Sequence, residues 1–403
     1  YKQDEGISYN ARDMAITRAS LENIPINLVT SIPSIETYNN IISKKYYITK
    51  IKKRYKEASL PSVEIINLNS EVLSKNSWIA NKTIINVNKY LEKGDQVLFF
   101  LNRRGYSPFT ICKKCGYKFQ CPNCAVNLNY HKNLNKLLCH YCGHKSALFR
   151  KCKDNKQCDL IFCGPGVERI YAELKKIYPN KKIEIFSSDT LEKNELASTL
   201  LKKAEKKQID ILVGTQMLSK GFHFPKLNCI VVVDGDFSSH GYDLRSAEKN
   251  IQLYHQLSGR AGRTGDKSII YFQTYTPNDE LLINISKKDP NLFLEKELIL
   301  RREKKLPPFY KLISIIISGK DQNFVMKFAL NFKAKLPKIN NEVNVLGPVL
   351  APITKLRNKY RYRILIRYPK KLFIQKYLSP SLNRIKIMPG IKLEVDVDPV
   401  NFS

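Results

Sequence analysis

QIDILVGT (208–215) and NCIVVVDGD (228–236) are short runs of valine, isoleucine and leucine that end at glycine, threonine or aspartate. Such runs, rich in β-branched residues and bounded by turn-forming residues, are typical of strands buried on both faces. Amphipathic helical patterns lie around them, in CGPGVERIYAELKKIY (163–178) and over residues 191–207 and 245–257. Because apolar strands alternate with helices, the sequence predicts an α/β fold with a doubly wound, mostly parallel sheet.

Three further apolar runs extend this pattern. They are QVLFFLNRRG (96–105), KIEIFSSD (182–189) and SIIYFQT (268–274). In a doubly wound sheet, functional side chains belong at the carboxyl ends of the strands. We therefore expect Thr215, Asp234 and the loop around Arg260 at or near that edge. The G-x-G of GPGVERI lacks the third glycine of a dinucleotide-binding turn, so that function is set aside.

The chain is strongly basic. Its 403 residues include 68 Lys and Arg against 36 Asp and Glu, a net charge of +32. This excess predicts nucleic acid as the partner, with a lysine-rich solvated surface as the alternative. The length predicts two or three domains. No apolar run approaches the ~20 residues of a membrane span and no leader pattern occurs, so we expect a cytoplasmic protein without membrane contact.

Eight of the ten cysteines lie close together in the sequence. They are Cys112, Cys115, Cys121, Cys124, Cys139, Cys142, Cys152 and Cys158. Three C-x-x-C pairs have the spacing at which two thiolates face one zinc ion, and eight ligands make two tetrahedral sites. Disulfides and redox pairs are the alternatives, which the expected cytosolic location and the repetition of the pair disfavour.

The spacing suggests that the two zinc sites are nested. The predicted inner site is formed by Cys121, Cys124, Cys139 and Cys142, and the predicted outer site by Cys112, Cys115, Cys152 and Cys158. The last pair has the spacing C-x5-C, so the outer site departs from the zinc-knuckle pattern. Cys163 and Cys229 flank apolar runs and are expected to be core thiols.

Several motifs resemble one protein family. They are FLNRRGYSPF (100–109), GTQMLSKGFHFP (214–225), QLSGRAGR (256–263), RREKKLPPFY (301–310) and the cysteine array. Together they resemble the PriA family of bacterial replication-restart helicases over essentially all 403 residues. The resemblance implies a RecA-like second helicase lobe with an inserted two-zinc module, followed by a smaller α+β domain. The family's DNA-binding head and most of its first motor lobe have no counterpart in this chain.

Two positions depart from the family pattern. Asn155 stands where the family has its last zinc ligand, and Cys158 follows three residues later. In VTSIP (29–33), Val29 and Ile32 replace a glycine and a threonine of the family pattern. In the family, this segment couples the state of the bound nucleotide to the strength of DNA binding. The threonine hydroxyl of that segment is therefore lost here.

Composition and the resemblance together predict the domain boundaries. The expected parts are the end of the first lobe (1–45), a basic linker with a short strand (46–70), the second lobe (71–275) with its zinc insertion (112–158), and a C-terminal domain for DNA and partners (276–403). The C-terminal part is expected to contain helices at 292–304 and 322–335 and strands near 312–318, 362–368 and 391–397. Proline in LPPF ends the first of these helices, because it excludes helical geometry from the preceding residue.

The resemblance implies half of an ATP site. Arg260 and Arg263 match arginine fingers, which stabilise charge on the transferring phosphoryl group, and Gln256 matches a contact to phosphate or water. The glycines expected near the nucleotide are Gly221, Gly259 and Gly262. An anion-coordinating surface turn is the alternative interpretation of the arginines.

The sequence contains no phosphate loop of the form G-x-x-x-x-G-K-[ST]. Its nearest approach, RTGDKS (263–268), places Asp266 where glycine must be. ATP and Mg²⁺ are therefore expected only together with the missing first lobe, and the isolated chain is expected to be inactive.

Contacts to DNA phosphates are expected from Thr215 and Lys220, and from Arg103 and Arg104 after the strand at 96. For each, an exposed side chain without a partner is the alternative. In KYRYRILIRY (359–368), alternation predicts a half-buried strand with a basic outer face. The expected partners are forked and single-stranded DNA, single-strand-binding protein, other primosome proteins and the missing lobe.

Two functions follow from these patterns. The first is part of an ATP-dependent 3′→5′ DNA helicase that remodels stalled forks for helicase reloading. The second is a non-enzymatic, zinc-stabilised DNA-binding remnant or scaffold. The helicase function is favoured for a complete protein by the motifs QLSGRAGR and GTQMLSKGF. The scaffold function is favoured for this chain in isolation by the altered VTSIP segment and the absent phosphate loop.

Overall fold

The computed structural model describes most of the chain. The described residues are 2–3, 9–51, 60–73, 77–101, 111–112, 117, 119, 121–122, 128–131, 136–139, 143–147, 160–161, 167–186, 194–215, 224–236, 243–262, 266–287 and 290–400. The chain divides into two compact units, which are described separately. The parallel-sheet unit comprises residues 40–139 and 145–297, and the antiparallel-sheet unit comprises residues 1–39, 140–144 and 298–403.

The parallel-sheet unit is built around six strands in the order β10-β11-β4-β12-β13-β3, all parallel. The strands are β3 (Ser62–Asn67), β4 (Gln96–Phe100), β10 (Ile183–Phe186), β11 (Ile211–Gly214), β12 (Leu227–Val232) and β13 (Ile269–Thr274). The helices are α3 (Asn81–Leu91), α4 (Val167–Ile177), α6 (Asn194–Glu205), α7 (Ser246–Ser258), α8 (Glu280–Ser286) and the first part of α9 (Pro290–Glu303), with a short 3-10 turn at Leu68–Ser70. The predicted doubly wound sheet is confirmed.

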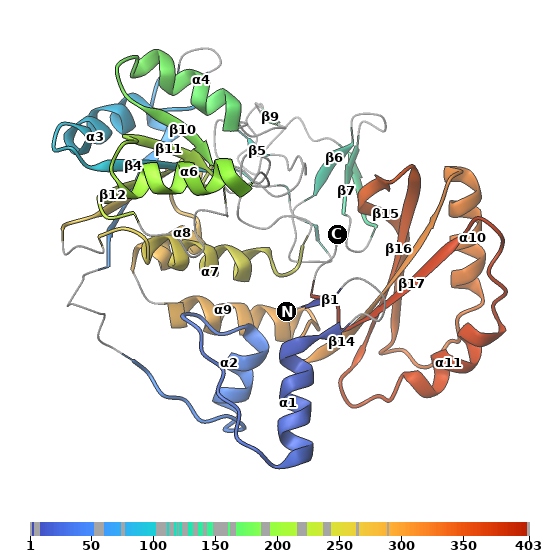
Figure 1. Ribbon diagram of the computed structural model, residues 1–403. Helices are drawn as coiled ribbons and strands as arrows, with labels where there is room; N and C mark the ends of the chain where they lie inside the picture. The colour runs from blue at the N-terminus through green and yellow to red at the C-terminus, as the bar shows by residue number, and fades with distance from the viewer. Residues whose placement is uncertain are drawn as a thin grey trace. The chain divides into compact units, whose positions relative to one another are not determined.

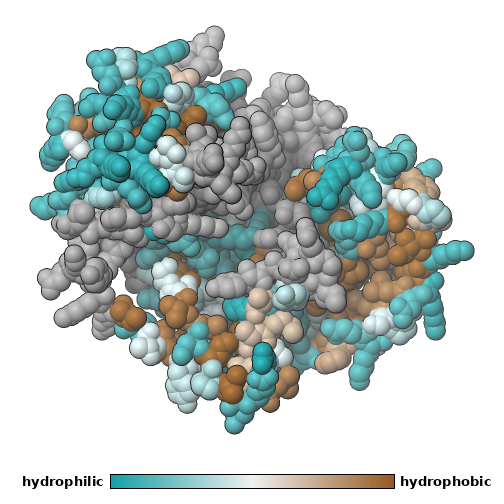
Figure 2. Space-filling model, viewed as in Figure 1, coloured by the Kyte–Doolittle hydropathy of each residue, from teal (hydrophilic) through white to brown (hydrophobic). Residues whose placement is uncertain are grey.

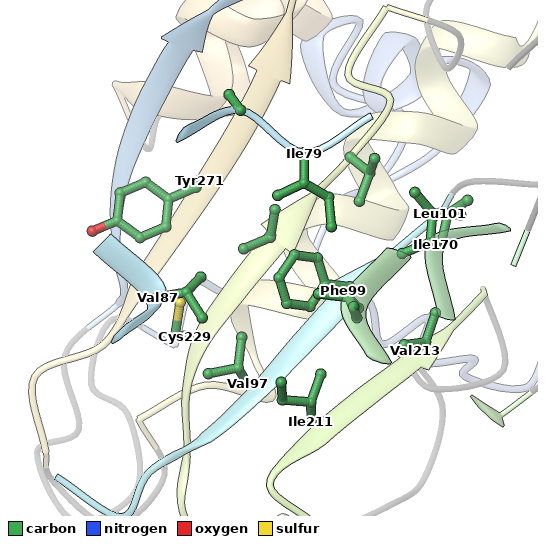
Figure 3. Packing of buried hydrophobic residues seen from close by; sticks show 14 of the residues in the cluster. Ile79, Val87, Val97, Phe99, Leu101, Ile170, Ile211, Val213, Cys229 and Tyr271 are labelled. Atoms are coloured by element: carbon green, nitrogen blue, oxygen red, sulfur yellow. The ribbon is translucent and has the colours of Figure 1, made fainter. Parts of the chain in front are cut away.

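Helices cover both faces of this sheet (Figure 1), which explains why its strands are apolar without alternation. On one face, Val97 and Phe99 of β4 pack with Ile170 of α4 and Val87 of α3 (Figure 3). On the other face, the ring of Tyr254 in α7 meets Phe272 of β13 edge to face, with centroids 5.0 Å apart. The core therefore lies in two layers that fix α7 against the sheet.

β3 corrects one predicted boundary. Residues 46–70 were expected to form a linker with a short strand, but β3 pairs with β13 from Ser62↔Ile269 to Asn67↔Thr274 and is the edge strand of the sheet. Sequence separation conceals this pairing, because β3 precedes its partner by about two hundred residues and only folding brings them together.

Polar side chains anchor the start of α3 to the same sheet. Gln273 of β13 accepts a hydrogen bond from the Ala80 amide (2.9 Å) and from the Thr83 hydroxyl (2.6 Å). Glu173 of α4 accepts from the amide of Trp78 (3.0 Å). Helix N-termini carry amide groups without partners in the helix, and here neighbouring elements supply the acceptors.

The antiparallel-sheet unit contains four strands in the order β15-β16-β14-β17. The strands are β14 (Tyr310–Gly319), β15 (Asn344–Leu356), β16 (Lys359–Pro369) and β17 (Lys392–Val397), and the helices are α1 (Ala11–Glu22), α2 (Ile35–Ile42), the end of α9, α10 (Gln322–Ala334) and α11 (Gln375–Arg384), with a small pair of strands β1 (Lys2–Gln3) and β2 (Tyr9–Asn10). The predicted strands β14, β16 and β17 and helices α9 and α10 are confirmed. β15 and α11 were not predicted.

The predicted basic outer face of β16 is wrong. Tyr362, Ile364, Ile366 and Tyr368 do face the core, but Arg363 on the opposite face is only 1% exposed. The backbone of Gly143 approaches this face, since a Cβ there would lie 2.5 Å from Cγ1 of Val349, the register partner of Arg363. β16 is an inner strand with both faces covered, which alternation alone does not reveal.

The other two arginines on this face of β16 are half-buried. Arg367 donates to the carbonyl oxygen of Lys304 (3.0 Å), in the segment that follows α9. Burial lowers the pKa of the Arg361 guanidinium, against the opposing effect of Glu394.

None of the helices among the described residues combines the length and the apolar character that a membrane-spanning helix needs.

Candidate nucleotide and nucleic-acid sites

Thr215 and Asp234 lie at the carboxyl edge of the parallel sheet, as predicted. Thr215 follows β11 and is half-buried, and Asp234 follows β12 and is buried. The amide of Leu101, which follows β4, donates to the carbonyl oxygen of Gly214 (2.9 Å). The end of β4 therefore lies beside the residue that precedes Thr215. Arg103 and Arg104, together with Lys220, lie outside the described residues.

Asp236 ties two neighbouring loops together at this edge. Its carboxylate accepts hydrogen bonds from the amides of Tyr275 (2.5 Å) and Thr276 (3.1 Å) and from the Thr274 hydroxyl (2.5 Å). The segment after β12 is thus fastened to the segment after β13. Asp236 was not predicted as a functional residue, although a second acidic residue in VVVDGD, two residues after Asp234, was a signal for it.

The turn that carries Arg260 lies at the opposite edge of the sheet, which corrects the prediction. The amide of Gly262 donates to the carbonyl oxygen of Leu227 (3.2 Å), the first residue of β12. A helix that joins two parallel strands runs back toward their amino ends, so the turn after it lies there. α7 has 13 residues, so the two edges are separated by about 20 Å.

Gln256 and Arg260 both lie near this amino edge. Gln256 is exposed on the last turn of α7, and Arg260 is half-buried two residues beyond the helix. The carboxyl end of a helix carries partial negative charge, which disfavours anions. Any attraction for phosphate at this edge must therefore come from positively charged side chains. Arg263 and Gly221 lie outside the described residues.

Gly262 shapes the turn behind Arg260. Its φ of +67° lies in the left-handed region, and a Cβ at this position would lie 2.4 Å from the buried hydroxyl of Ser268 and 3.1 Å from the carbonyl oxygen of Asp266. Both the backbone conformation and the surrounding atoms therefore require glycine.

We expect Gly262→Ala to lower the free energy of unfolding of the parallel-sheet unit by about 3 kcal/mol, through left-handed strain and displacement of Ser268. Gly94→Ala is the matched control, because Gly94 has a φ of +74° with nothing within 4 Å of its Cβ position. It should cost about 1 kcal/mol. Urea unfolding followed by fluorescence of the single tryptophan, Trp78, measures both. Equal losses in the two variants would contradict the packing argument.

Three of the eight predicted zinc ligands lie within the described residues and all three are buried. They are Cys112, Cys121 and Cys139. Cys112 lies in β5 (Ile111–Cys112), and Cys139 directly follows β7 (Lys136–Leu138), the middle strand of a small sheet with β6 (Asn129–His131) and β8 (Lys145–Ala147). No disulfide links two of the described cysteines, and no group of three metal-binding side chains occurs among the described residues. The other five predicted ligands lie outside them.

The two ends of the cysteine-rich segment meet. β5 pairs antiparallel with β9 (Leu160–Ile161), with Cys112 opposite Leu160. The Cys112 amide donates to the carbonyl oxygen of Tyr117 (3.0 Å). This pairing places the start of the array beside its end, as nested sites require. Buried thiols fit zinc ligands.

The C-terminal domain contains a run without acidic residues, a signal that the sequence analysis missed. Residues 343–393 include no Asp or Glu, whereas the chain as a whole holds 36. Twelve Lys and Arg occur in the same run. Phe373 and Tyr377, beside Lys370, Lys371 and Lys376, are 70% and 48% exposed. Counting acidic residues in a window would have found this anion-binding candidate.

Comparison with known proteins agrees with these features. Family models match a "Primosomal protein N C-terminal domain" at residues 302–400, a "PriA DNA helicase Cys-rich region (CRR) domain" at 121–146 and a "Helicase conserved C-terminal domain" at 134–265. The cysteine-rich match supports zinc binding by this segment.

Curated relatives match along the whole chain. The replication restart protein PriA of Rickettsia conorii is 42% identical over 100% of this chain and 62% of its own length. Those of Bacillus subtilis and Haemophilus influenzae are each 32% identical, over 99% and 100% of this chain and 50% and 55% of their own lengths. Among solved structures, RecG bound to a three-way DNA junction has a TM-score of 0.33 at 14% identity, covering 61% of this chain and 23% of that chain. The chain spans about half to two thirds of the length of these curated relatives, and by its motifs, cysteine-rich region and full-length similarity it belongs to the PriA family of replication restart proteins.

Proposed function

We propose that this chain forms the second motor lobe, zinc module and C-terminal domain of an ATP-dependent 3′→5′ DNA helicase that acts in replication restart. The observation that carries the proposal is the joint placement of Gln256 and Arg260 at one edge of a parallel sheet, in a chain whose sequence contains no phosphate loop. Arginines held in this way serve a triphosphate bound by another lobe.

The N-terminal segment supports the docking of such a lobe. Residues 9–42 expose large apolar side chains, among them Met14 (55%), Leu21 (82%) and Val29 (93%). Figure 2 shows apolar residues gathered over α1 and α2. Apolar patches of this kind on a soluble protein mark an interaction surface. The occupant that fits is the rest of the first lobe, which would bring ATP and Mg²⁺.

DNA is the proposed partner at two places. At the carboxyl edge of the parallel sheet, Thr215 and the segments after β4 and β11 contact backbone phosphates of the tracking strand. In the C-terminal domain, the acid-free run attracts phosphates, and the exposed rings of Phe373 and Tyr377 stack on unpaired bases. Forked DNA, with both single-stranded and duplex parts, suits this combination. Single-strand-binding protein and other primosome proteins are further proposed partners.

Two zinc ions are proposed for the cysteine-rich segment. Cys121, Cys124, Cys139 and Cys142 would hold the inner ion, and Cys112, Cys115, Cys152 and Cys158 the outer ion. The pairing of β5 with β9 supports the outer site. Zinc bound by four thiolates is structural: it stabilises short strands and loops that have too little core of their own.

The alternative function is a zinc-stabilised DNA-binding scaffold without a motor. Similarity to replication restart proteins along the whole chain, including the segment that carries Gln256 and Arg260, favours the helicase. A scaffold would have no need of Gln256, Arg260 and Gly262 in this arrangement.

The test compares the chain alone with a chimera that joins it to the part of the Rickettsia conorii relative outside the match. We expect the chain alone to bind forked DNA with an affinity that falls steeply with salt, and not to hydrolyse ATP. The chimera should hydrolyse ATP when DNA is added. ATP hydrolysis by the chain alone would contradict the proposal that it carries only half of an ATP site. A chimera that binds DNA but does not hydrolyse ATP would favour the scaffold function.

A further inference from the structure

Arg301 is a buried charge in the last turn of α9. Its side chain is 2% exposed, and its Nη1 donates to the carbonyl oxygen of Pro307 (3.4 Å). The same Nη1 lies 3.9 Å from Oε1 of Glu36, in the first turn of α2. Glu36 and Arg301 are 265 positions apart in the sequence, so this pair joins the N-terminal segment to the start of the C-terminal domain.

Burial around Glu36 supports a fixed contact. Ile32 and Ile35, on either side of the start of α2, are 1% and 0% exposed, whereas Val29 just before them is 93% exposed. Residues 1–39 form one compact unit with residues 298–403, and residues 40–139 belong to the other unit. The N-terminal segment therefore packs with the C-terminal domain, although the chain continues from it directly into the parallel-sheet unit.

We propose that Glu36 and Arg301 fasten residues 9–39 to the C-terminal domain, so that the two move as one body and couple ATP turnover to DNA held by the C-terminal domain. This inference rests on the proposed function, in which residues 9–39 belong to the first motor lobe. The physical basis is that a guanidinium taken out of water is stabilised by a carboxylate and by carbonyl acceptors, and loses that environment if α2 moves away. Glu36 and Arg301 are positioning residues and contact no nucleotide.

The first experiment measures the fastening in the zinc-loaded chain. Glu36→Lys places a like charge against the buried guanidinium, and we expect amide hydrogen exchange over residues 29–42 to become about tenfold faster. Adding Arg301→Met to Glu36→Lys removes the repulsion and keeps an unbranched side chain, so exchange should return to within about threefold of the original rate.

Glu280→Lys is the matched control. Glu280 pairs with Lys296 of α9 at 2.8 Å, but both side chains are exposed, at 72% and 56%. A like charge at an exposed pair costs little, so exchange over residues 29–42 should not change. Unchanged exchange in Glu36→Lys, or no recovery in the double variant, would overturn the fastening.

The second experiment measures coupling in the chimera. With Glu36→Lys, we expect the amount of DNA unwound per ATP hydrolysed to fall about tenfold, while DNA-stimulated hydrolysis falls less than about threefold; Arg301→Met in the same background restores the ratio. A parallel loss of hydrolysis and unwinding, or an unchanged ratio, would overturn the coupling. A chimera without any ATP hydrolysis would contradict the proposed function instead, and the exchange measurement decides the fastening independently.

Discussion

Replacing Arg260 by alanine in the chimera should lower the DNA-stimulated rate of ATP hydrolysis by about three orders of magnitude or more, the range measured for arginine fingers. The guanidinium stabilises charge that develops on the transferring phosphoryl group, so its loss acts on turnover more than on substrate binding. Arg260→Lys should recover only part of the rate, because an ammonium group lacks the planar fork that contacts two oxygens.

The control for Arg260 is Arg169→Ala, which removes the same charge from an exposed position on α4. It should leave hydrolysis within about twofold of the original rate, as surface charges usually do. Arg260→Ala should also keep its affinity for forked DNA, since Thr215 lies at the other edge of the sheet and the second proposed DNA site lies in the C-terminal domain. Equal hydrolysis by the two alanine variants would show that Arg260 faces no nucleotide.

Loss of single cysteines should remove whole zinc ions. We expect about two zinc ions per chain. Cys139→Ser and Cys112→Ser should each retain about one, because each removes a thiolate from a different four-ligand site. Structural zinc sites provide folding free energy of about 10 kcal/mol or more, so hydrogen exchange should rise sharply over residues 111–161 while the six-stranded sheet stays protected. Metal analysis and exchange on the same samples measure both effects.

Cys229→Ala is the matched control for the zinc ligands. Cys229 is buried in β12, and desolvation, followed by the nearby Asp95, raises the pKa of its thiol far above the ordinary value. A protonated thiol does not ligate zinc, so this variant should keep both ions. If the unaltered chain binds only one zinc ion, the proposed outer site, where Asn155 replaces the ligand of the family, is contradicted. If Cys139→Ser keeps its full zinc content, the proposed inner site is contradicted.

Much of the fold could be predicted because the relevant signals are local. The strands at 211–214 and 269–274 lie within predicted apolar runs, and the strand at 227–232 begins one residue before such a run, since strands buried on both faces need continuous apolar residues. The cysteine spacing predicted the zinc-binding segment for a similar reason, since both thiolates of a C-x-x-C pair come from one turn. Gly262 was singled out by its motif, and its left-handed conformation supplies the physical reason.

Other features depend on contacts between distant segments. The sequence by itself determined the parallel sheet, the cysteine-rich segment and the basic character of the chain. Only the tertiary structure decided that β3 closes the sheet, that Arg260 and Thr215 occupy opposite edges, that Arg363 is buried and that Glu36 meets Arg301. The physical reason is that the periodicity of a segment shows which of its side chains are buried on the same face. The element that packs against that face comes from elsewhere in the chain, and its position is fixed only when the whole core forms.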